Sequence, residues 1–365
     1  MKKHDLTRIK ITVISLAFTG ALMVWAKYAG PGFFDAYSAF TIAFQGALSK
    51  ITGIVSFSVF ELLCVTGLIA AVVNLILAIK RERFVKWITA FIMTACLLLF
   101  GFTATWGLNH FGPPVTDKLG LNVGKYSVDD LEATTVYFMD RAGEAAEDLP
   151  ANDDGTTAFS DFLTLARQAP DCYKDLEIEV GNGNTIFPPE IASIFGGSDA
   201  PVKPLASGKL FSYMGTTGIF IFLTGESNVN PDAYVAAIPF TMCHELAHRK
   251  GVAQEEGANF CAFLACNASK NPEFRYSGFY ESFIYCYNSL YKVAPDKALA
   301  IWEDASPRLY ADITATNTHY RQYDGKVQEA AQHLNDSYLK AYGEAQGVQS
   351  YGAVTDSLIA WYLAQ

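Results

Sequence analysis

The stretch Pro239–Gly251, PFTMCHELAHRKG, contains the pattern H-E-x-x-H from His244 to His248. Residues four apart lie on the same face of a helix, so both imidazoles could reach one metal ion without distorting the backbone. Glu245 lies beside them, where a carboxylate could take a proton from a water on that ion. The pattern predicts a helix with two zinc ligands, His244 and His248, and a general base, Glu245. The alternative is an amphipathic helix whose histidines only form hydrogen bonds.

A catalytic zinc site also needs a third protein ligand and a free fourth position. Basic residues followed by Gly251 are typical of a helix end, and a second helix with acids in its first turn is expected over Gln254–Ser269. A tight reversal would return this turn to the metal, so Glu255 is the expected third ligand and Glu256 the alternative. The metzincin pattern H-E-x-x-H-x-x-G-x-x-H fits less well, because Gln254 replaces its last histidine and a neutral amide is a poor zinc ligand.

A strand is expected upstream of the metal helix. The run Gly218–Thr224, GIFIFLT, is rich in β-branched and aromatic residues. Such a strand can pair with an extended substrate, which makes Glu226 and Asn228 at its exit candidate substrate-binding residues. An ordinary polar turn is the alternative. Peptide hydrolysis also needs a donor that stabilises the oxyanion. Tyr276 is the expected donor among the candidates Arg275, Tyr276, His319 and Tyr351.

The other residues after the third apolar stretch predict helices around a small sheet. Helices are expected over Ser127–Leu149, which has acids in its first turn, and over Ala158–Gln168. Residues 176–239 are rich in Gly, Pro, Thr and Ser, whereas apolar residues recur at helical spacing from Phe240 onward. We therefore expect a mainly α fold with a small β-sheet, an α+β zincin-like domain, behind three transmembrane helices.

Three stretches are apolar and long enough to cross a bilayer, for which a helix needs roughly 20 residues. They cover about residues 9–28, 53–79 and 87–109 of a chain that is 51% hydrophobic and 18% charged. Between the first two, residues 33–51 predict a helix that lies in the interface or packs on the exterior domain. Glu61, near the start of the second stretch, is expected at the headgroup level without a further role.

Charge is distributed unevenly along the chain. Residues 1–112 contain ten Lys and Arg but four Asp and Glu, whereas residues 113–365 contain 17 and 33. Basic residues precede the first stretch and join the second to the third, so both clusters are expected in the cytoplasm. Three spans then make residues 113–365 the extracytoplasmic domain of a multi-pass plasma-membrane protein. A cleaved signal peptide at the first stretch would leave two spans and the same exterior domain. The lipid bilayer is an expected partner, and so acidic a domain predicts no nucleic-acid partner.

Several blocks of the sequence resemble an uncharacterised bacterial membrane-protein family classed as a domain of unknown function. The blocks are GIFIFLTGESNVN (218–230), PFTMCHELAHRKG (239–251), EEGANFCAFLAC (255–266), FRYSGF (274–279) and GVQSYGAVTDSLIAWY (347–362). The resemblance implies N-terminal spans joined to an H-E-x-x-H domain with metallopeptidase activity. In addition, Glu255-x-x-Ala258-Asn259 resembles the E-x-x-A-D/N signature of gluzincin-type peptidases, whose leading Glu binds the metal, and this favours Glu255 over Glu256. In the membrane-protein family that the blocks resemble, an acid is expected at position 257. Gly257 departs from this pattern, which puts the local helix in question.

Together these features predict a membrane-anchored zinc metallopeptidase that hydrolyses peptide or protein substrates. Zinc would be held by His244, His248 and Glu255, with Glu245 as the general base. Two alternatives remain from the sequence. The same site could hydrolyse cell-wall amides, or the protein could be a membrane scaffold or binding module in which a metal only stabilises the fold.

Overall fold

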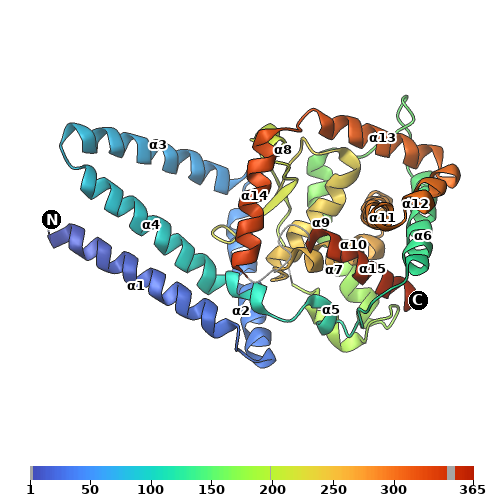
Figure 1. Cartoon of the computed structure of the whole chain (residues 1–365), viewed down its shortest axis with the longest axis horizontal. Helices are drawn as coiled ribbons and strands as arrows, with labels where there is room; N and C mark the ends of the chain where they lie inside the picture. The colour runs from blue at the N-terminus through green and yellow to red at the C-terminus, as the bar shows by residue number, and fades with distance from the viewer. Residues whose placement is uncertain (1–2, 198, 343–349) are drawn as a thin grey trace.

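The computed structural model describes residues 3–197, 199–342 and 350–365 (Figure 1). Its helices are α1 (Lys3–Ala26), α2 (Pro31–Thr52), α3 (Val59–Lys80), α4 (Phe84–Thr105), α5 (Val115–Lys118), α6 (Val128–Glu147), α7 (Phe162–Gly181), α8 (Gly208–Tyr213), α9 (Ile238–Arg249), α10 (Glu255–Ala268), α11 (Pro272–Val293), α12 (Pro295–Ile301), α13 (Pro307–Arg321), α14 (Lys326–Ala341) and α15 (Ser350–Leu363). Its strands are β1 (Lys203–Pro204), β2 (Gly218–Ile221) and β3 (Glu226–Val229), and its 3-10 helices are η1 (Gly107–Phe111), η2 (Pro189–Ile194), η3 (Val235–Ala237) and η4 (Trp302–Asp304). The described chain is thus mainly helical with one small sheet, as the sequence predicts.

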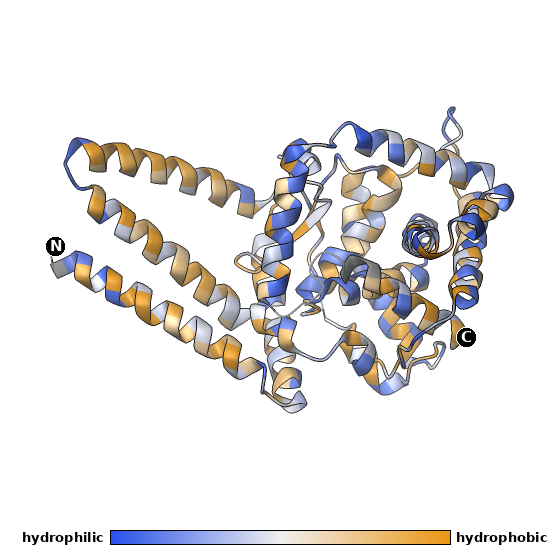
Figure 2. Ribbon diagram, in the orientation of Figure 1, coloured by the Kyte–Doolittle hydropathy of each residue, from blue (hydrophilic) through white to orange (hydrophobic). Residues whose placement is uncertain are grey.

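Helices α1, α3 and α4 extend away from the rest of the molecule (Figure 1) and consist mostly of apolar residues (Figure 2). Each is long and apolar enough to cross a membrane. A 22-residue helix such as α3 or α4 is about 33 Å long, which matches the roughly 30 Å of hydrocarbon in a bilayer. Both α1 and α3 pack against α4. The expectation of three helices suited to a membrane is confirmed.

The bounds of these helices differ from the apolar stretches in the sequence. The first helix begins at Lys3 rather than near residue 9, because its polar first turns are also helical. The third ends at Thr105, and the chain leaves the helical conformation at Trp106, with φ −151°, before it enters η1. Hydropathy marks the apolar part of a helix, whereas its ends are set by backbone geometry.

Helix α2 covers nearly the range 33–51 expected from the sequence. It buries one side, formed by residues three or four apart: Phe34, Tyr37, Thr41, Gln45 and Ser49. This side packs against α9 and β3. Of the two sequence-based options, the structure shows the helix packed on the described residues that follow α4, which we call the exterior part after the sequence-based expectation.

Helix α9, which carries the H-E-x-x-H pattern, lies at the centre of the exterior part (Figure 1). It packs against α7, α10, α11 and the strands β2 and β3. All 12 of its residues are buried. Polar side chains on such a helix must find partners among their neighbours, and these partners fix their orientation.

Of the two helices expected before the sheet, α6 starts where the sequence predicts, whereas α7 is longer than predicted. Helix α6 has the expected start: the Ser127 hydroxyl accepts from the Asp130 N–H, and the Asp130 carboxylate accepts from the Ser127 N–H. Helix α7 is longer than the expected Ala158–Gln168 and continues through Pro170. Proline removes one backbone hydrogen bond. The helix continues nevertheless, because a row of its apolar side chains is buried on both sides of Pro170.

The sheet has the strand order β1-β3-β2, with β1 parallel and β2 antiparallel to β3, so β2 is an edge strand. Strand β2 ends at Ile221, before the expected end at Thr224, because the chain turns there and Gly225 adopts a φ of +66°. A Cβ at Gly225 would lie 2.6 Å from Gln45 O and 2.7 Å from Ser49 N in α2. Only glycine allows both this conformation and this close approach.

A buried ion pair joins the sheet to the membrane helices. Lys203 in β1 pairs with Glu226 in β3, and their side chains are 4% and 1% exposed. The Glu226 carboxylate accepts hydrogen bonds of 2.9 Å from the N–H groups of Val59 and Phe60 at the start of α3. The Lys203 ammonium donates to Thr52 O at the end of α2, at 2.7 Å. Glu226 therefore has a structural role in place of the expected contact with substrate, because both of its oxygens are used here.

Two further charged side chains connect the membrane helices to the exterior part. Glu61 in α3 accepts hydrogen bonds from the N–H groups of Ala206, at 2.7 Å, and Ser207, at 2.9 Å. Arg249, at the end of α9, is buried and donates to the Ser49 hydroxyl in α2 at 2.6 Å. Glu61 was expected to have no role beyond its place at the headgroup level. It instead anchors the loop that precedes α8.

We expect Lys203→Met or Glu226→Leu alone to lower the free energy of unfolding by about 3–5 kcal/mol, because each leaves a buried charge without its partner. The double variant should lose clearly less than the sum of the two single losses. Thermal and denaturant unfolding of the detergent-solubilised protein measure these values. Lys174→Met and Asp171→Leu, which break an exposed pair, should change little. Strictly additive losses for Lys203 and Glu226 would contradict the coupling.

Candidate metal centre

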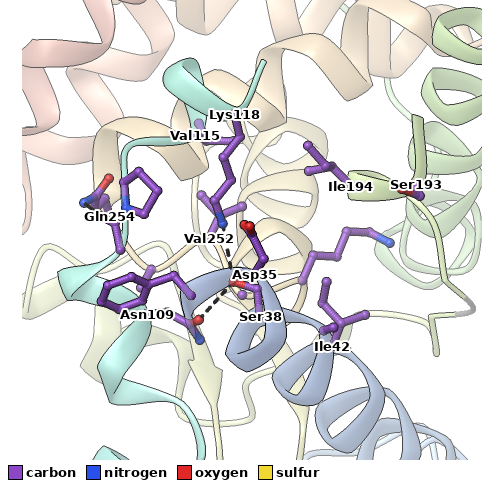
Figure 3. Close-up of a pocket in the computed structure, with 17 residues that line it drawn as sticks. Asp35, Ser38, Ile42, Asn109, Val115, Lys118, Ser193, Ile194, Val252 and Gln254 are labelled. Atoms are coloured by element: carbon purple, nitrogen blue, oxygen red, sulfur yellow. Dashed lines mark hydrogen bonds between the residues drawn. The ribbon is translucent and has the colours of Figure 1, made fainter. Parts of the chain in front are cut away.

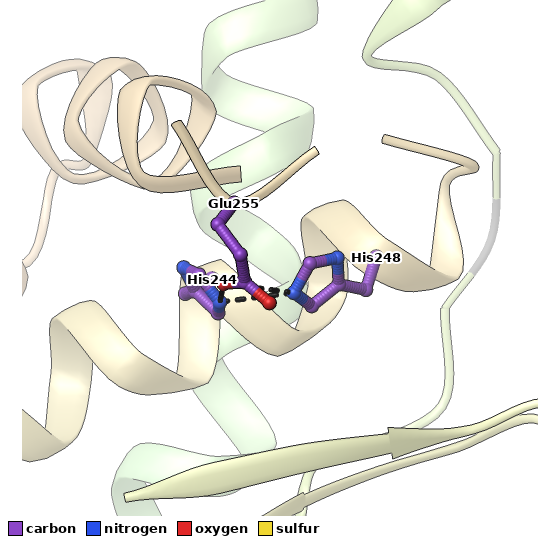
Figure 4. A group of neighbouring side chains, drawn as sticks. All are labelled: His244, His248 and Glu255. Carbon is purple, nitrogen blue, oxygen red and sulfur yellow. Dashed lines mark hydrogen bonds and ion pairs between the residues drawn. The ribbon is translucent and has the colours of Figure 1, made fainter. Parts of the chain in front are cut away.

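Three side chains from α9 and α10 converge on one point (Figure 4). The Nε2 atoms of His244 and His248 are 3.0 Å apart. The Glu255 Oε2 atom lies 3.3 Å from His244 Nε2 and 3.7 Å from His248 Nε2. One possible ligand atom from each residue lies within 4.8 Å of the others. The structure thus brings together the three residues that the sequence names as metal ligands.

Each imidazole is oriented by a hydrogen bond from its other ring nitrogen. His244 Nδ1 lies 2.7 Å from Asn259 Oδ1, and His248 Nδ1 lies 2.8 Å from Val252 O. A carbonyl oxygen only accepts hydrogen bonds, so Nδ1 carries a proton in both rings, and Nε2 is the nitrogen that can offer a lone pair to a metal. The Tyr285 hydroxyl donates to the same Asn259 oxygen at 3.2 Å. Metal-binding histidines are commonly oriented in this way.

The charges around this cluster favour a cation. Burial lowers the pKa of His248, but the charge and hydrogen bond of Glu255, together with the charge of Glu245, raise it to about 9. Burial raises the pKa of Glu255, yet the two histidines outweigh this effect and hold it well below its usual range. Both shifts follow from the attraction between the Glu255 carboxylate and the neighbouring imidazole of His248.

Glu245 lies beneath the edge strand β2. Its side chain is buried, and Oε2 has no hydrogen-bond partner in the part of the chain that the structure describes. Burial raises the pKa of Glu245 to about 7, although the charges of His244 and His248 act in the opposite direction. A Cβ at Gly218 would lie 2.8 Å from Glu245 Cγ. The lack of a side chain at Gly218 therefore allows β2 to pass directly over this carboxylate.

Three side chains hold the backbone of α9 through its carbonyl oxygens. They donate hydrogen bonds of 2.8–3.0 Å, from Tyr173 to Cys243 O, from Ser227 to Glu245 O and from Trp106 to His248 O. Trp106 directly follows the last residue of α4, and its ring lies 6.1 Å from the His248 ring. The metal helix is therefore fixed to the end of a helix suited to cross the membrane.

The turn between the two ligand-bearing helices follows the sequence-based expectation. Gly251 has a φ of +83°, and α10 begins directly with Glu255. Gly257, which departs from the pattern of the membrane-protein family that the sequence resembles, lies within a regular helix. A Cβ there would lie 3.1 Å from side-chain atoms of Val115 and Val252. Glycine at this position thus reflects close packing and leaves the helix intact.

The alternative third ligands lie outside the cluster. Gln254 donates from its amide to Gly112 O at 3.2 Å. Glu256 does not belong to the group of possible ligands found among the described residues. Both observations favour Glu255.

Tyr276 does not reach the metal cluster. It is fully buried, and its hydroxyl donates to Asp312 Oδ2 at 2.5 Å. The same carboxylate accepts from the hydroxyl groups of Thr157 and Tyr234. Tyr276 is therefore part of a buried structural network and not the expected oxyanion donor.

The other residues singled out in the sequence lie elsewhere or are already bonded. Asn228 is fully buried in β3, with its amide 3.4 Å from Glu226 O, and the structure shows no contact surface for substrate there. Arg275 donates to Ser269 O, and His319 bonds to Asp232 O. The Tyr351 side chain lies outside the described residues.

Residues that orient or surround the cluster were not assigned a role from the sequence. Asn259 lies four residues after Glu255 on the same face of α10, and this spacing could have marked it as a partner of the site. Tyr285 and Glu281 are likewise four apart on α11. Burial raises the pKa of Glu281 to about 7. No local pattern points to Trp106, because its contact with His248 spans 142 residues.

A separate cavity of about 430 Å³ lies beside the loop that joins α9 to α10 (Figure 3). Asp35, Ser38 and Ile42 of α2 line it, together with Lys118 and the backbone of the loop 250–254. Burial lowers the pKa of Lys118, while the charge of Asp35 acts in the opposite direction. The three candidate metal ligands do not line this cavity, so it is distinct from the cluster.

The chain was compared with known proteins and families. No curated protein matches it, and no solved structure matches it. The profile of a family described as "Protein of unknown function (DUF3810)" matches residues 37–359, which include most of α2, two of the three apolar helices and the candidate metal centre. This match covers most of the sequence, and the protein therefore belongs to the DUF3810 family.

Proposed function

We propose that this protein is a membrane-anchored, zinc-dependent peptidase with a zincin-like exterior domain. The observation that carries the proposal is the convergence of two imidazole Nε2 atoms and one carboxylate, next to the buried Glu245, whose Oε2 has no partner among the described residues. Peptidase zinc sites use this donor set, with three protein ligands and one free position.

The donor chemistry fits zinc. Imidazole nitrogen and carboxylate oxygen are both good zinc ligands, and the lone pairs here are already directed at one point. Structural zinc sites usually have four protein ligands. No fourth His, Cys, Asp or Glu joins the three within the described ranges. The set therefore supports a catalytic site over a metal that only stabilises a scaffold.

In the proposed reaction, His244, His248 and Glu255 hold the ion. Zinc, when bound, lowers the pKa of water toward 7 and polarises a carbonyl group. Glu245 takes the proton from the attacking water at Oε2 and passes it to the nitrogen of the leaving amine. Burial beneath β2 keeps bulk water away from this carboxylate.

The edge strand supports a polypeptide substrate over a cell-wall amide. Strand β2 pairs only with β3 among the described strands, so no described strand occupies its other edge, where an extended chain could pair. Backbone pairing of this kind recognises polypeptides with little regard to side chains. Because β2 passes over Glu245 at Gly218, a paired chain would run past the proposed base.

The proposed site lies on the extracytoplasmic side. The N-terminus and the turn between α3 and α4 lie at the same end of the apolar helices (Figure 1). Lys and Arg residues are concentrated at this end: Lys3, Arg8 and Lys10 on α1, and Lys80, Arg81, Arg83 and Lys86 around the turn. Positively charged ends of this kind stay in the cytoplasm.

The first prediction concerns metal content. The purified protein should contain close to one zinc ion per chain, and His244→Ala or Glu255→Ala should remove it. Asn259→Ala should weaken zinc binding about 10- to 100-fold, because it releases the His244 ring. Elemental analysis and competition with a chelating dye measure these quantities. Glu256→Ala is the matched control and should keep its zinc. If Glu256→Ala lost its zinc and Glu255→Ala kept it, Glu256 would be the third ligand in place of Glu255.

The second prediction concerns catalysis. Glu245→Gln should lower peptide hydrolysis about 100- to 10,000-fold, because the amide cannot accept the proton. Zinc content and thermal stability should stay close to those of the wild type. Cleavage of a mixed peptide library, followed by mass spectrometry, provides the measurement, with Glu256→Gln as control. Equal product from wild type and Glu245→Gln would reject the hydrolase and favour the scaffold.

The third prediction concerns orientation. Alkaline phosphatase fused after Gln365 should be active in cells, and green fluorescent protein at the same position should be dark. Fusions after Arg81 should show the opposite pattern, because the basic turn stays in the cytoplasm. The same pattern at both positions would contradict the proposed topology.

A further inference from the structure

We infer that the substrate is a polypeptide anchored in the same membrane, cut a few residues from the lipid surface. This inference rests on the proposed peptidase function and adds the class of substrate to it. Three features carry it: the height of the metal centre, the place where lipid-facing surface ends, and the direction of β2.

The metal centre lies directly above the end of α4. Trp106 follows the last residue of this helix and donates from its indole N–H to His248 O at 3.0 Å. The headgroup region is roughly 5–8 Å thick on each side of a bilayer. His248, which this contact fixes to the end of α4, therefore lies at or just above the headgroups. A site in a domain held on a flexible linker would lie much farther from the bilayer.

The lipid-facing surface ends just below this level. On α4, Leu98 and Leu99 are 46% and 41% exposed, whereas Thr103 is completely covered by protein. On α3, Leu62 is 51% exposed, while the preceding Glu61 is bonded to the exterior loop. Seven residues separate Leu99 from Trp106, a rise of about 10 Å. The exterior part thus rests on the lipid with the metal centre about one headgroup layer above the hydrocarbon.

The edge strand runs from the membrane toward Glu245. The ring of Phe222, just after the end of β2, lies 5.1 Å from Phe102 in α4, and the ring of Phe220 in β2 lies 5.4 Å from Trp106, just after the end of α4. Later residues of the first segment thus contact earlier residues of the second, so β2 leads from Gly218 toward the apolar helices. Its lower end is the turn with Leu223, which is 46% exposed. Its upper end is Gly218, over the Glu245 carboxylate.

A substrate that leaves the bilayer beside α4 would meet the free edge of β2 at its lower end. From the lipid surface to Glu245 an extended chain needs about 3–4 residues, at 3.3 Å per residue. A bond at this distance from the membrane reaches the metal centre directly. A segment held far above the bilayer does not reach it.

The experiment uses the full chain in zinc-loaded proteoliposomes. A quenched fluorescent peptide with a random central segment is supplied in three forms: free, joined to a membrane helix by about four flexible residues, or joined by a rigid helical spacer of about 20 residues that lifts it roughly 30 Å. The second and third forms are equally confined to the membrane and differ in height. We expect the short-linked form to be cleaved at least about tenfold faster than the lifted form, the change expected for about 1.4 kcal/mol.

The outcomes separate the two claims. Equal cleavage of all three forms, abolished by Glu245→Gln, overturns the membrane-anchored substrate and leaves the peptidase intact. Cleavage of none of the forms overturns the peptidase and the inference with it.

A readout without catalysis tests the height directly. A photo-crosslinking amino acid at Leu223 should label lipid, whereas the same group at Leu299 in α12, a leucine that is at least as exposed, should not. Figure 1 shows α12 at the opposite end of the molecule from α1, α3 and α4. Absence of lipid labelling at Leu223 would overturn the placement of the edge strand at the membrane.

Discussion

The buried pair of Lys203 and Glu226 is the constraint on which the arrangement of the two parts depends. The carboxylate oxygens of Glu226 accept from the first N–H groups of α3, and the ammonium of Lys203 donates to the last carbonyl group of α2. A helix start and a helix end, each with unsatisfied backbone groups, thus meet at one charged pair between two strands. Because the strand β3 that carries Glu226 also packs on α9, this pair links the position of the metal helix to the helices suited to the membrane.

The side chains of the candidate metal centre are also held in place by neighbouring groups. Each candidate ligand or base depends on a neighbouring group: Asn259 Oδ1 accepts from His244, Val252 O accepts from His248, and Gly218 leaves room for Glu245. The helix itself is held by side chains from α7, β3 and the end of α4. Such support fixes lone pairs in direction before any ligand arrives, which lowers the cost of binding.

The sequence predicts what depends on local spacing. The i,i+4 histidines, the reversal at Gly251 and the helix that begins at Glu255 are short-range features, and the structure has all three. The contacts of Tyr276 and Glu226 could not be predicted in this way, because their partners are distant in the chain: Asp312 for Tyr276, and the start of α3 for Glu226. A single sequence does not distinguish a charged residue in an exposed turn from a buried one, because burial depends on the whole fold.

The junction between the two parts also limits how the protein can be divided. Arg249 and Lys203 are buried in the exterior half, yet Ser49 and Thr52, with which they bond, belong to the first 112 residues. A fragment that starts after Gly112 would leave these two cations and the carboxylate of Glu226 without their partners in α2 and α3. It would also expose the apolar surfaces that α2 covers. Expression of residues 113–365 alone is therefore a route to an insoluble product, and biochemistry on this protein begins with detergent or lipid.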